Sequence, residues 1–223
     1  MVHVRAIDRS STTDRVAQAL RGMLFAGEIS PGEPLREVSL AEAFDVARST
    51  IREALRVLAA EGLVTRYPNR GVVVTELTDS DIEEIFGARL VLESAGVRAG
   101  VGGADLQPVA QALAAYARAA EDEAGDEAGD EALSTHAHLE FHNSLVALLG
   151  NPRLLANAHS LTADLRLGLA SVERARRNTK DQVADHRRLL RLIKAGDEAA
   201  ALAELRRHLA AAKTSVAARV VGS

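Results

Sequence analysis

The hydrophobic residues between positions 46 and 58 recur at the spacing of an amphipathic α-helix. Its apolar face comprises Ile51, Ala54, Leu55 and Leu58. Arg48, Arg52 and Arg56 recur every four residues on another side, where like charges repel one another unless an anion lies alongside. The arginine stripe is either a solvated surface or a contact for a phosphate backbone, and the flanking elements bear on the choice.

The residues before this helix predict two further helices. One begins near Asp14, capped by Thr12 or Thr13, and ends near Gly27. A turn-rich stretch follows, in which two prolines forbid a helix, and then a short helix from about Glu37 to Phe44. A short helix, a tight turn and a second helix form a helix-turn-helix, whose second helix enters the major groove of DNA.

After Gly62 the pattern changes to that of β-strands. Residues 63–67 and 71–75 are two β-prone runs, joined by a turn in which Gly71 is available for a positive φ. The hairpin carries Arg70 at its tip. Beside a helix-turn-helix such a hairpin is a wing, and its tip is suited to the minor groove or the DNA backbone.

The chain after residue 76 has a helical pattern. Thr78 and Asp81 have the spacing of a capping box, which marks the start of the first helix. Residues 121–131 hold seven acids and no base, so we interpret them as a solvated loop, because their spacing does not match a calcium-binding loop. The six expected helices cover about 82–99, 106–120, 133–149, 153–176, 181–194 and 197–220.

The predicted fold is mainly α: an N-terminal winged helix-turn-helix with a small β-hairpin, followed by an all-α antiparallel helical bundle. A length of 223 residues favours two domains, which we place at 1–75 and 81–223 with a linker at 76–80. With aromatic residues at 3% and no Trp, the core must consist of Leu, Val, Ile and Ala, and Ala and Leu favour helices.

Charge and composition exclude several classes of protein. The net charge is -4, yet residues 46–73 hold five Arg and two Glu, a local basic patch. The absence of Cys excludes a disulfide framework, a thiolate zinc finger and a Cys nucleophile. No signal peptide or long apolar run occurs, so we expect a cytoplasmic protein without a membrane partner.

Four of the seven histidines are candidate metal ligands. His138 and His142 are four residues apart on one predicted helix, so their rings can share a cation, and His186 and His208 lie on the last two helices. Taken singly, each is equally consistent with a hydrogen-bonded core or surface histidine. His136 should face elsewhere, and His159 on the following helix is a candidate to line the interior of the bundle rather than a predicted ligand.

Residues 31–75 resemble the winged helix of the GntR transcription regulators. By this resemblance Arg48, Ser49, Thr50 and Arg52 contact operator DNA, and Arg70 and Gly71 belong to the wing. Ala47 departs from the family, which usually carries Ser or Thr there. The matching residues are Pro31-Gly32, Leu35, Glu37, Leu40-Ala41, Val46, Arg48, Ile51-Arg52-Glu53-Ala54-Leu55, Leu58, Glu61-Gly62-Leu63-Val64 and Asn69-Arg70-Gly71.

The second half of the chain resembles the FCD domain of the FadR branch of that family. The resemblance implies an antiparallel bundle whose central cavity in many members holds a divalent metal on one Asp and three His. His142, His186 and His208 match the three, and His138 stands in place of the Asp. Four neutral imidazoles favour Zn²⁺ or Ni²⁺ over Mg²⁺ or Ca²⁺. The matching segments are Arg89 with Leu92-Glu93, Phe141-His142 with Leu145 and Gly150-Asn151, Asp185-His186-Arg187, Gly196-Asp197 and Arg207-His208-Leu209.

Arg89 has two interpretations: it forms an i,i+4 pair with Glu93, or it binds the carboxylate of an effector. We therefore predict a homodimeric regulator that binds palindromic operator DNA and senses a small organic acid at its bound metal. One alternative is a regulator for which the ion itself is the signal. A metal-dependent hydrolase is a second alternative, but Glu140 faces away from the paired histidines and no general base is evident, so we predict no enzyme.

Overall fold

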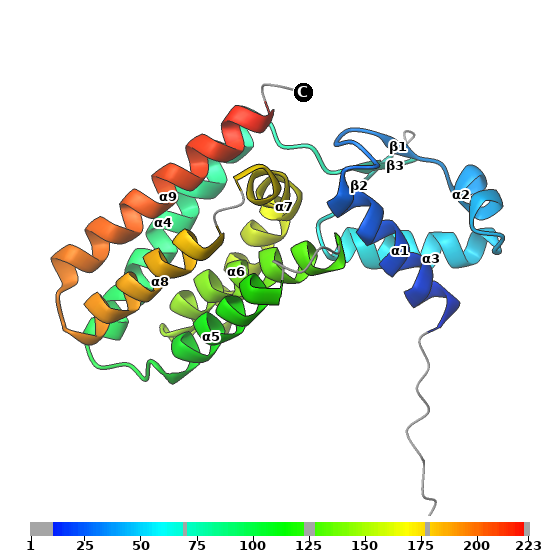
Figure 1. The fold of residues 1–223 in the computed structure, drawn as a ribbon. Coiled ribbons are helices and arrows are strands. Elements are labelled where there is room, and N and C mark those ends of the chain that lie inside the picture. Colours follow the sequence, from blue (N-terminus) through cyan, green and yellow to red (C-terminus); the bar gives the residue numbers. More distant parts are fainter. Residues whose placement is uncertain (1–10, 69–70, 123–127, 177–178, 221–223) are drawn as a thin grey trace, which may run out of the picture. The chain divides into compact units, whose positions relative to one another are not determined.

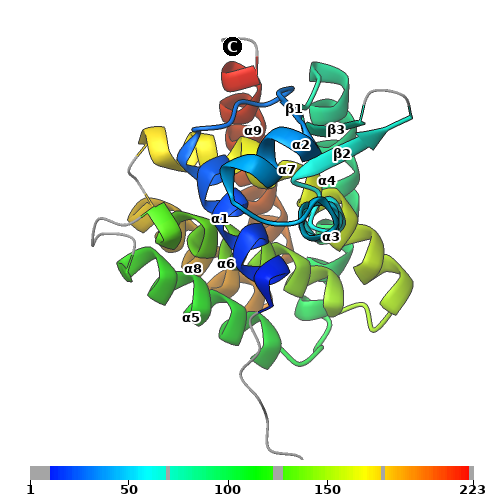
Figure 2. The ribbon, with the colours of Figure 1, turned by 90° about the vertical axis from the view of Figure 1, so that its right-hand side faces the viewer.

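The computed structural model describes residues 11–68, 71–122, 128–176 and 179–220. Contacts within the chain divide it into two compact units, residues 1–75 and residues 76–223. Helices and strands of both can be followed in Figures 1 and 2. None of the helices in the described ranges has the length and apolar character needed to span a membrane.

The first unit is held together by the packing of α1 (Thr12–Ala26) against α3 (Arg48–Ala60). The cap of α1 is Ser11, not Thr12 or Thr13: its side chain accepts a hydrogen bond from the Asp14 N–H, and the Asp14 carboxylate accepts one from the Ser11 N–H. This reciprocal pair satisfies two backbone donors that the helix leaves free, which a lone threonine cap would not do.

The helix-turn-helix consists of α2 (Glu37–Ala43) and α3. The turn between them includes Asp45 at φ 50°, a left-handed conformation that Asp tolerates better than most residues. Ala47 is the N-cap of α3 and makes no side-chain cap bond, so the first turn of this helix starts without a capping hydroxyl. The predicted apolar face is confirmed, because all of its members are buried: Ile51, Ala54, Leu55 and Leu58.

The sheet has three strands rather than the two expected. Strands β2 (Val64–Tyr67) and β3 (Gly71–Val74) form the predicted antiparallel hairpin, and Gly71 has the expected positive φ, 81°. The added strand is β1 (Pro34–Leu35), which pairs with β3 in the order β1-β3-β2. Two residues are too short to show a strand period, and a proline is tolerated there because β1 lies at the edge.

The second unit contains the six predicted helices over its described residues. The capping box of Thr78 and Asp81 is confirmed at the start of α4. The acidic stretch at 121–131 is not a loop throughout, in contrast to the prediction: α5 extends to Asp122 and α6 begins at Ala128 instead of near 133, while residues 123–127 lie outside the described ranges. The helices are α4 (Asp79–Val101), α5 (Gln107–Asp122), α6 (Ala128–Ala147), α7 (Pro152–Arg176), α8 (Thr179–Lys194) and α9 (Glu198–Val220).

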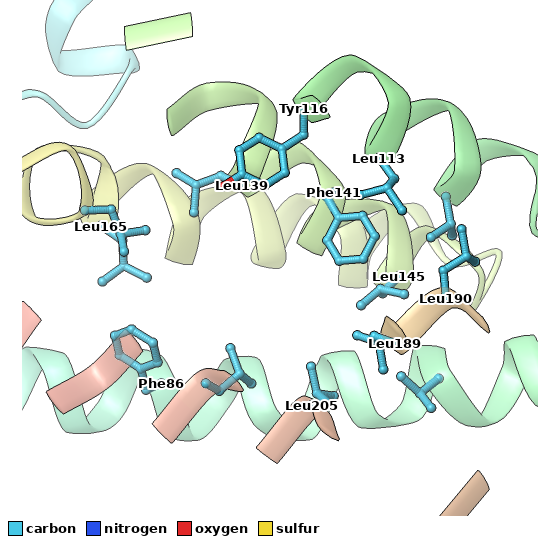
Figure 3. Close-up of a cluster of buried hydrophobic side chains, with 14 of the residues drawn as sticks. Phe86, Leu113, Tyr116, Leu139, Phe141, Leu145, Leu165, Leu189, Leu190 and Leu205 are labelled. Carbon is cyan, nitrogen blue, oxygen red and sulfur yellow. The ribbon is translucent and has the colours of Figure 1, made fainter. Parts of the chain in front are cut away.

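The core of this unit is built mostly from leucine, as the composition predicts. Side chains from each of the six helices point toward a shared interior in Figure 3, with Tyr116 and Phe141 its largest fully buried members. Helix α4 packs against both α9 and α6. At its contact with α6 the approach is close, because a Cβ added to Gly96 would lie 2.0 Å from the carbonyl oxygen of Leu145.

Gly96→Ala is expected to lower the free energy of unfolding by about 1–3 kcal/mol, because the added methyl group must displace the backbone of α6. Thermal unfolding followed by circular dichroism measures the change. Gly87→Ala on the same helix is the matched control: its Cβ meets no atom within 4 Å, and removal of a helical glycine should raise stability by up to about 1 kcal/mol. Equal effects of the two variants would contradict the close approach of α4 to α6.

Candidate functional site

Three helices of the second unit bring together the four candidate histidines. His138 and His142 come from successive turns of α6, His186 from α8 and His208 from α9. One ring nitrogen of each lies within 4.8 Å of the others, and three of the rings are buried while His208 is partly buried. We call these residues the histidine cluster. The i,i+4 spacing of the first two explains their shared direction, whereas the other two meet them only through the packing of the bundle.

Hydrogen bonds on the outer side of two rings fix their orientation. Nδ1 of His142 lies 2.7 Å from the carboxylate Oε2 of Glu93, and Nδ1 of His186 lies 2.5 Å from the backbone carbonyl of Gln182. A carbonyl or an ionised carboxylate can only accept, so Nδ1 carries the proton in both rings. Both Nε2 atoms then present lone pairs to the interior of the cluster.

The lone pairs of His142 and His186 cannot satisfy each other. The Nε2 atoms of His142 and His186 are 3.1 Å apart, but two acceptors cannot hydrogen-bond to each other. Nε2 of His208 is buried and has no hydrogen-bond partner among the residues that the structure describes. Acceptors that face one another in a buried site are unfavourable unless a donor or a cation lies between them. The residues present therefore fit a divalent metal ion.

Burial keeps the rings in the form that binds a metal. Desolvation lowers the pKa of His142, His186 and His208 well below the usual value, and the positive charge of Arg89 adds to this effect at His142 and His208. The neutral imidazole is the metal-binding species, so no proton has to be displaced from these three rings at neutral pH.

Aromatic rings form one wall of the cluster. Tyr116 stacks on His138 with ring centroids 4.9 Å apart and an interplanar angle of 13°, and Phe141 meets His186 edge to face at 4.5 Å. The Tyr116 hydroxyl donates to Oε1 of Gln182 at 2.9 Å, the same residue whose backbone orients His186. Sequence reasoning missed Tyr116 and Gln182, because only the packing of α5 against α8 brings them to the histidines.

Arg89 forms the ion pair with Glu93 that was one of its two interpretations. Its Nε donates to Oε1 of Glu93 at 2.8 Å, and its guanidinium lies over the ring of Phe86 at 5.3 Å. Both members of the pair are buried, so this is not a solvated helix pair. Burial raises the pKa of Glu93 and the charge of Arg89 opposes that rise.

The other histidines of α6 and α7 lie outside the cluster. His136 is exposed and contacts Arg166, and His159 lies near Asn143 and Glu140. Glu140 accepts a hydrogen bond from Asn143 and therefore belongs to this second polar group.

The predicted DNA contacts lie at the amino end of α3 and on the wing. Arg48 and Ser49 are exposed and Thr50 is half-buried in the first turn of α3, and Gly71 is exposed at the start of β3, while Arg70 lies outside the described residues. Arg52 is half-exposed and pairs with Glu37, whose carboxylate lies 2.9 Å from Nη2. Arg52 holds the pKa of Glu37 below its usual value, with smaller effects from Arg66 and Arg48.

Sequence reasoning missed Glu37 as the partner of Arg52. The two residues are 15 positions apart on different helices, so no helical spacing relates them. Arg56 also has an acidic partner, Glu53, on its own helix. The arginine stripe is thus partly neutralised in the free protein.

Comparison with known proteins identifies both units. Residues 12–74 match the family described as bacterial regulatory proteins, gntR family, and residues 84–211 match the FCD domain. The chain is 31% identical to the Nta operon transcriptional regulator of Aminobacter aminovorans, over 83% of this chain and 87% of that protein. A solved GntR transcriptional regulator from Rhodococcus sp. RHA1 has a TM-score of 0.70 and 31% identity, covering 96% of this chain and 99% of that one.

Several other relatives match less than half of the chain. The gluconate operon transcriptional repressor of Bacillus licheniformis is 46% identical over 88 residues, which cover 40% of this chain but only 36% of the repressor's length. The predicted winged helix-turn-helix and helical bundle are both confirmed by the family matches. The chain belongs to the GntR family of bacterial regulatory proteins, in its FadR subfamily with an FCD domain, and this is a family of transcription regulators rather than enzymes.

Proposed function

We propose that this protein is a homodimeric regulator that binds operator DNA and whose helical unit binds a divalent metal and an organic acid. The observation that carries the proposal is the buried histidine cluster: Nε2 of His142 and Nε2 of His186 face each other at 3.1 Å, and among the described residues Nε2 of His208 has no hydrogen-bond partner. In this proposal residues 1–75 bind DNA, 76–80 form the linker, and 81–223 bind the ligands and dimerise.

The proposed DNA-reading surface is the first turn of α3 together with the wing. Arg48, Ser49 and Thr50 would reach base edges or phosphates in the major groove, and Arg70 and Gly71 would lie against the backbone or minor groove. The Arg52–Glu37 pair does not prevent a DNA contact by Arg52. An exposed ion pair is worth about 0–1 kcal/mol, so a phosphate can replace Glu37 at small cost.

We expect a dimer because of the number of bases that operator recognition requires. One winged helix contacts few bases, and two related by a two-fold axis read a palindrome. Val91, 70% exposed in the middle of α4, supports an interface on that helix. We assign this exposed apolar position to contact with a second copy of the chain.

The proposed metal is Zn²⁺ or Ni²⁺, held by the four rings of the histidine cluster. Imidazole nitrogens suit both ions, and the neutral set offers no carboxylate of the kind that Mg²⁺ and Ca²⁺ prefer. A bound ion supplies a positive charge and a coordination position for an anionic ligand. Arg89 adds a second anchor, since among the described residues its only hydrogen bond uses Nε and its other donors remain for a ligand carboxylate.

Regulation would follow from linkage between the ligand site and the operator. If the effector favours a packing of the bundle in which the two winged helices no longer match successive half-sites, operator affinity falls by the coupling free energy. That coupling is typically about 1–3 kcal/mol, or roughly 5–150-fold. The second candidate, in which the ion is the signal, rests on the same histidine cluster without Arg89.

Arg52→Ala is expected to weaken operator binding and to reduce the slope of log K against log salt by about 0.9, the value for one phosphate contact. Fluorescence anisotropy at several salt concentrations measures the slope. Arg15→Ala is the control. Arg15 is an exposed residue of α1 in the same unit, so its replacement removes the same charge and should leave the slope unchanged. An unchanged slope for Arg52→Ala would remove Arg52 from the interface.

The double variant His142→Ala with His186→Ala is expected to lose its bound metal while keeping its helical content, because it deletes two of the four rings. Metal content after dialysis is measured by mass spectrometry and helical content by circular dichroism. His136→Ala, a change of the same type at an exposed position of α6, should retain the metal. Full retention by the double variant would refute the assignment of the histidine cluster.

A screen of carboxylic acids by thermal shift, with and without a chelator, tests the effector and separates the two candidate functions. A ligand at 100 times its Kd adds about 2.7 kcal/mol of stability, which corresponds to a rise of roughly 5–10 °C for a chain of this size. A rise that chelation abolishes supports an acid coordinated to the metal. A rise from zinc alone, with no acid adding to it, supports the ion as the signal.

A further inference from the structure

Glu93 is a buried carboxylate that touches the histidine cluster without belonging to it. It lies on α4, is 2% exposed, and uses its two oxygens on different partners. Oε1 accepts from Nε of Arg89 at 2.8 Å, and Oε2 lies 2.7 Å from Nδ1 of His142. A buried charge persists only when it is paired, and the partners of Glu93 are the guanidinium of Arg89 and the ring of His142.

The contact with His142 is on the side of the ring that faces away from the cluster. The opposite nitrogen, Nε2, lies 3.3 Å from Nε2 of His138 and 3.1 Å from Nε2 of His186. With Glu93 accepting from Nδ1, the proton stays there and the lone pair of Nε2 points into the cluster. A carboxylate in this position also makes the ring a stronger electron donor than a neutral acceptor does.

The cluster offers an internal comparison. His186 is oriented in the same way, but its Nδ1 donates to the neutral backbone carbonyl of Gln182. A backbone carbonyl can orient a ring but brings no charge. Glu93 contributes a negative charge next to four rings that have none, at a distance set by one hydrogen bond.

We propose that Glu93 is the positioning residue of the metal site, holding His142 in its metal-binding tautomer and supplying the negative charge that the four imidazoles lack. The inference rests on the proposed metal function of the histidine cluster. Arg89 has a supporting part, because its Nε donates to the other oxygen of the Glu93 carboxylate and its charge opposes the rise in the pKa of Glu93 that burial causes.

The test is the zinc affinity of the full-length chain, measured by competition with a chromogenic chelator well below the unfolding temperature. Glu93→Gln preserves the side-chain volume and removes the charge, and we expect it to weaken zinc binding about 10–100-fold. The visible absorption spectrum of Co²⁺ should change as well, since the geometry of His142 is altered. Glu83→Gln, on the exposed face of the same helix, should leave affinity and spectrum unchanged.

Loss of Glu93 also leaves Arg89 buried without its partner, which lowers the stability of the fold. Weaker zinc binding that results only from this instability has to be distinguished from weaker binding that results from loss of the positioning contact. The double variant Arg89→Gln with Glu93→Gln removes both charges of the pair and should recover most of the lost melting temperature. Zinc affinity should nevertheless stay below that of the wild type, and recovery of zinc affinity in the double variant would overturn the inference. Glu93→Asp, which keeps the charge on a shorter side chain, should bind zinc with intermediate affinity.

Two negative results have different meanings. If the wild-type chain binds zinc and Glu93→Gln binds it equally well, the role of Glu93 is wrong and the metal site stands. If the wild-type chain binds neither Zn²⁺ nor Ni²⁺, the proposed metal function itself fails and takes the role of Glu93 with it.

Discussion

The burial of ionisable groups inside a leucine-rich bundle is the constraint on which the helical unit depends. His138, His142 and His186 are almost completely buried, as is the Arg89–Glu93 pair. Apolar packing alone would make such groups costly, since each must find a partner or lose its charge. The helices therefore pack so that Glu93 pairs with Arg89 and accepts from His142, while the carbonyl of Gln182 accepts from His186. Leucines make up much of the surrounding core.

In the first unit the electrostatic arrangement is different, because the charges lie at the surface. Glu37 is half-buried among basic side chains and pairs with Arg52, while Arg66 and Arg48 lie close enough to lower its pKa further. A compensated surface of this kind costs little in the free protein and exposes its positive charge only when an anion competes with the carboxylate.

A feature could be predicted from the sequence when the residues involved lie within one helix or strand, and not when they come together only through packing. Helical periodicity located α3 and its buried face, and the i,i+4 spacing of His138 and His142 showed that they share a direction, because these relations lie within one helix. The convergence of His186 and His208 depends on how α8 and α9 pack, and only the family resemblance suggested it. The strand β1, the Arg52–Glu37 pair and the Tyr116–His138 stack are likewise tertiary and have no local pattern.

The close approach of α4 to α6 at Gly96 also affects the contact between Glu93 and His142. Gly96 lies three residues after Glu93, and Leu145, whose carbonyl it nearly touches, lies three residues after His142. The absence of a side chain at position 96 thus sets the distance between α4 and α6, about one helical turn from the contact between the Glu93 carboxylate and the His142 ring. A bulkier residue there would push α4 away from α6 and lengthen the contact between the Glu93 carboxylate and His142, while leaving the winged helix in place. Such a change would separate the proposed metal site from the proposed DNA-binding surface, because only the metal site lies beside Gly96.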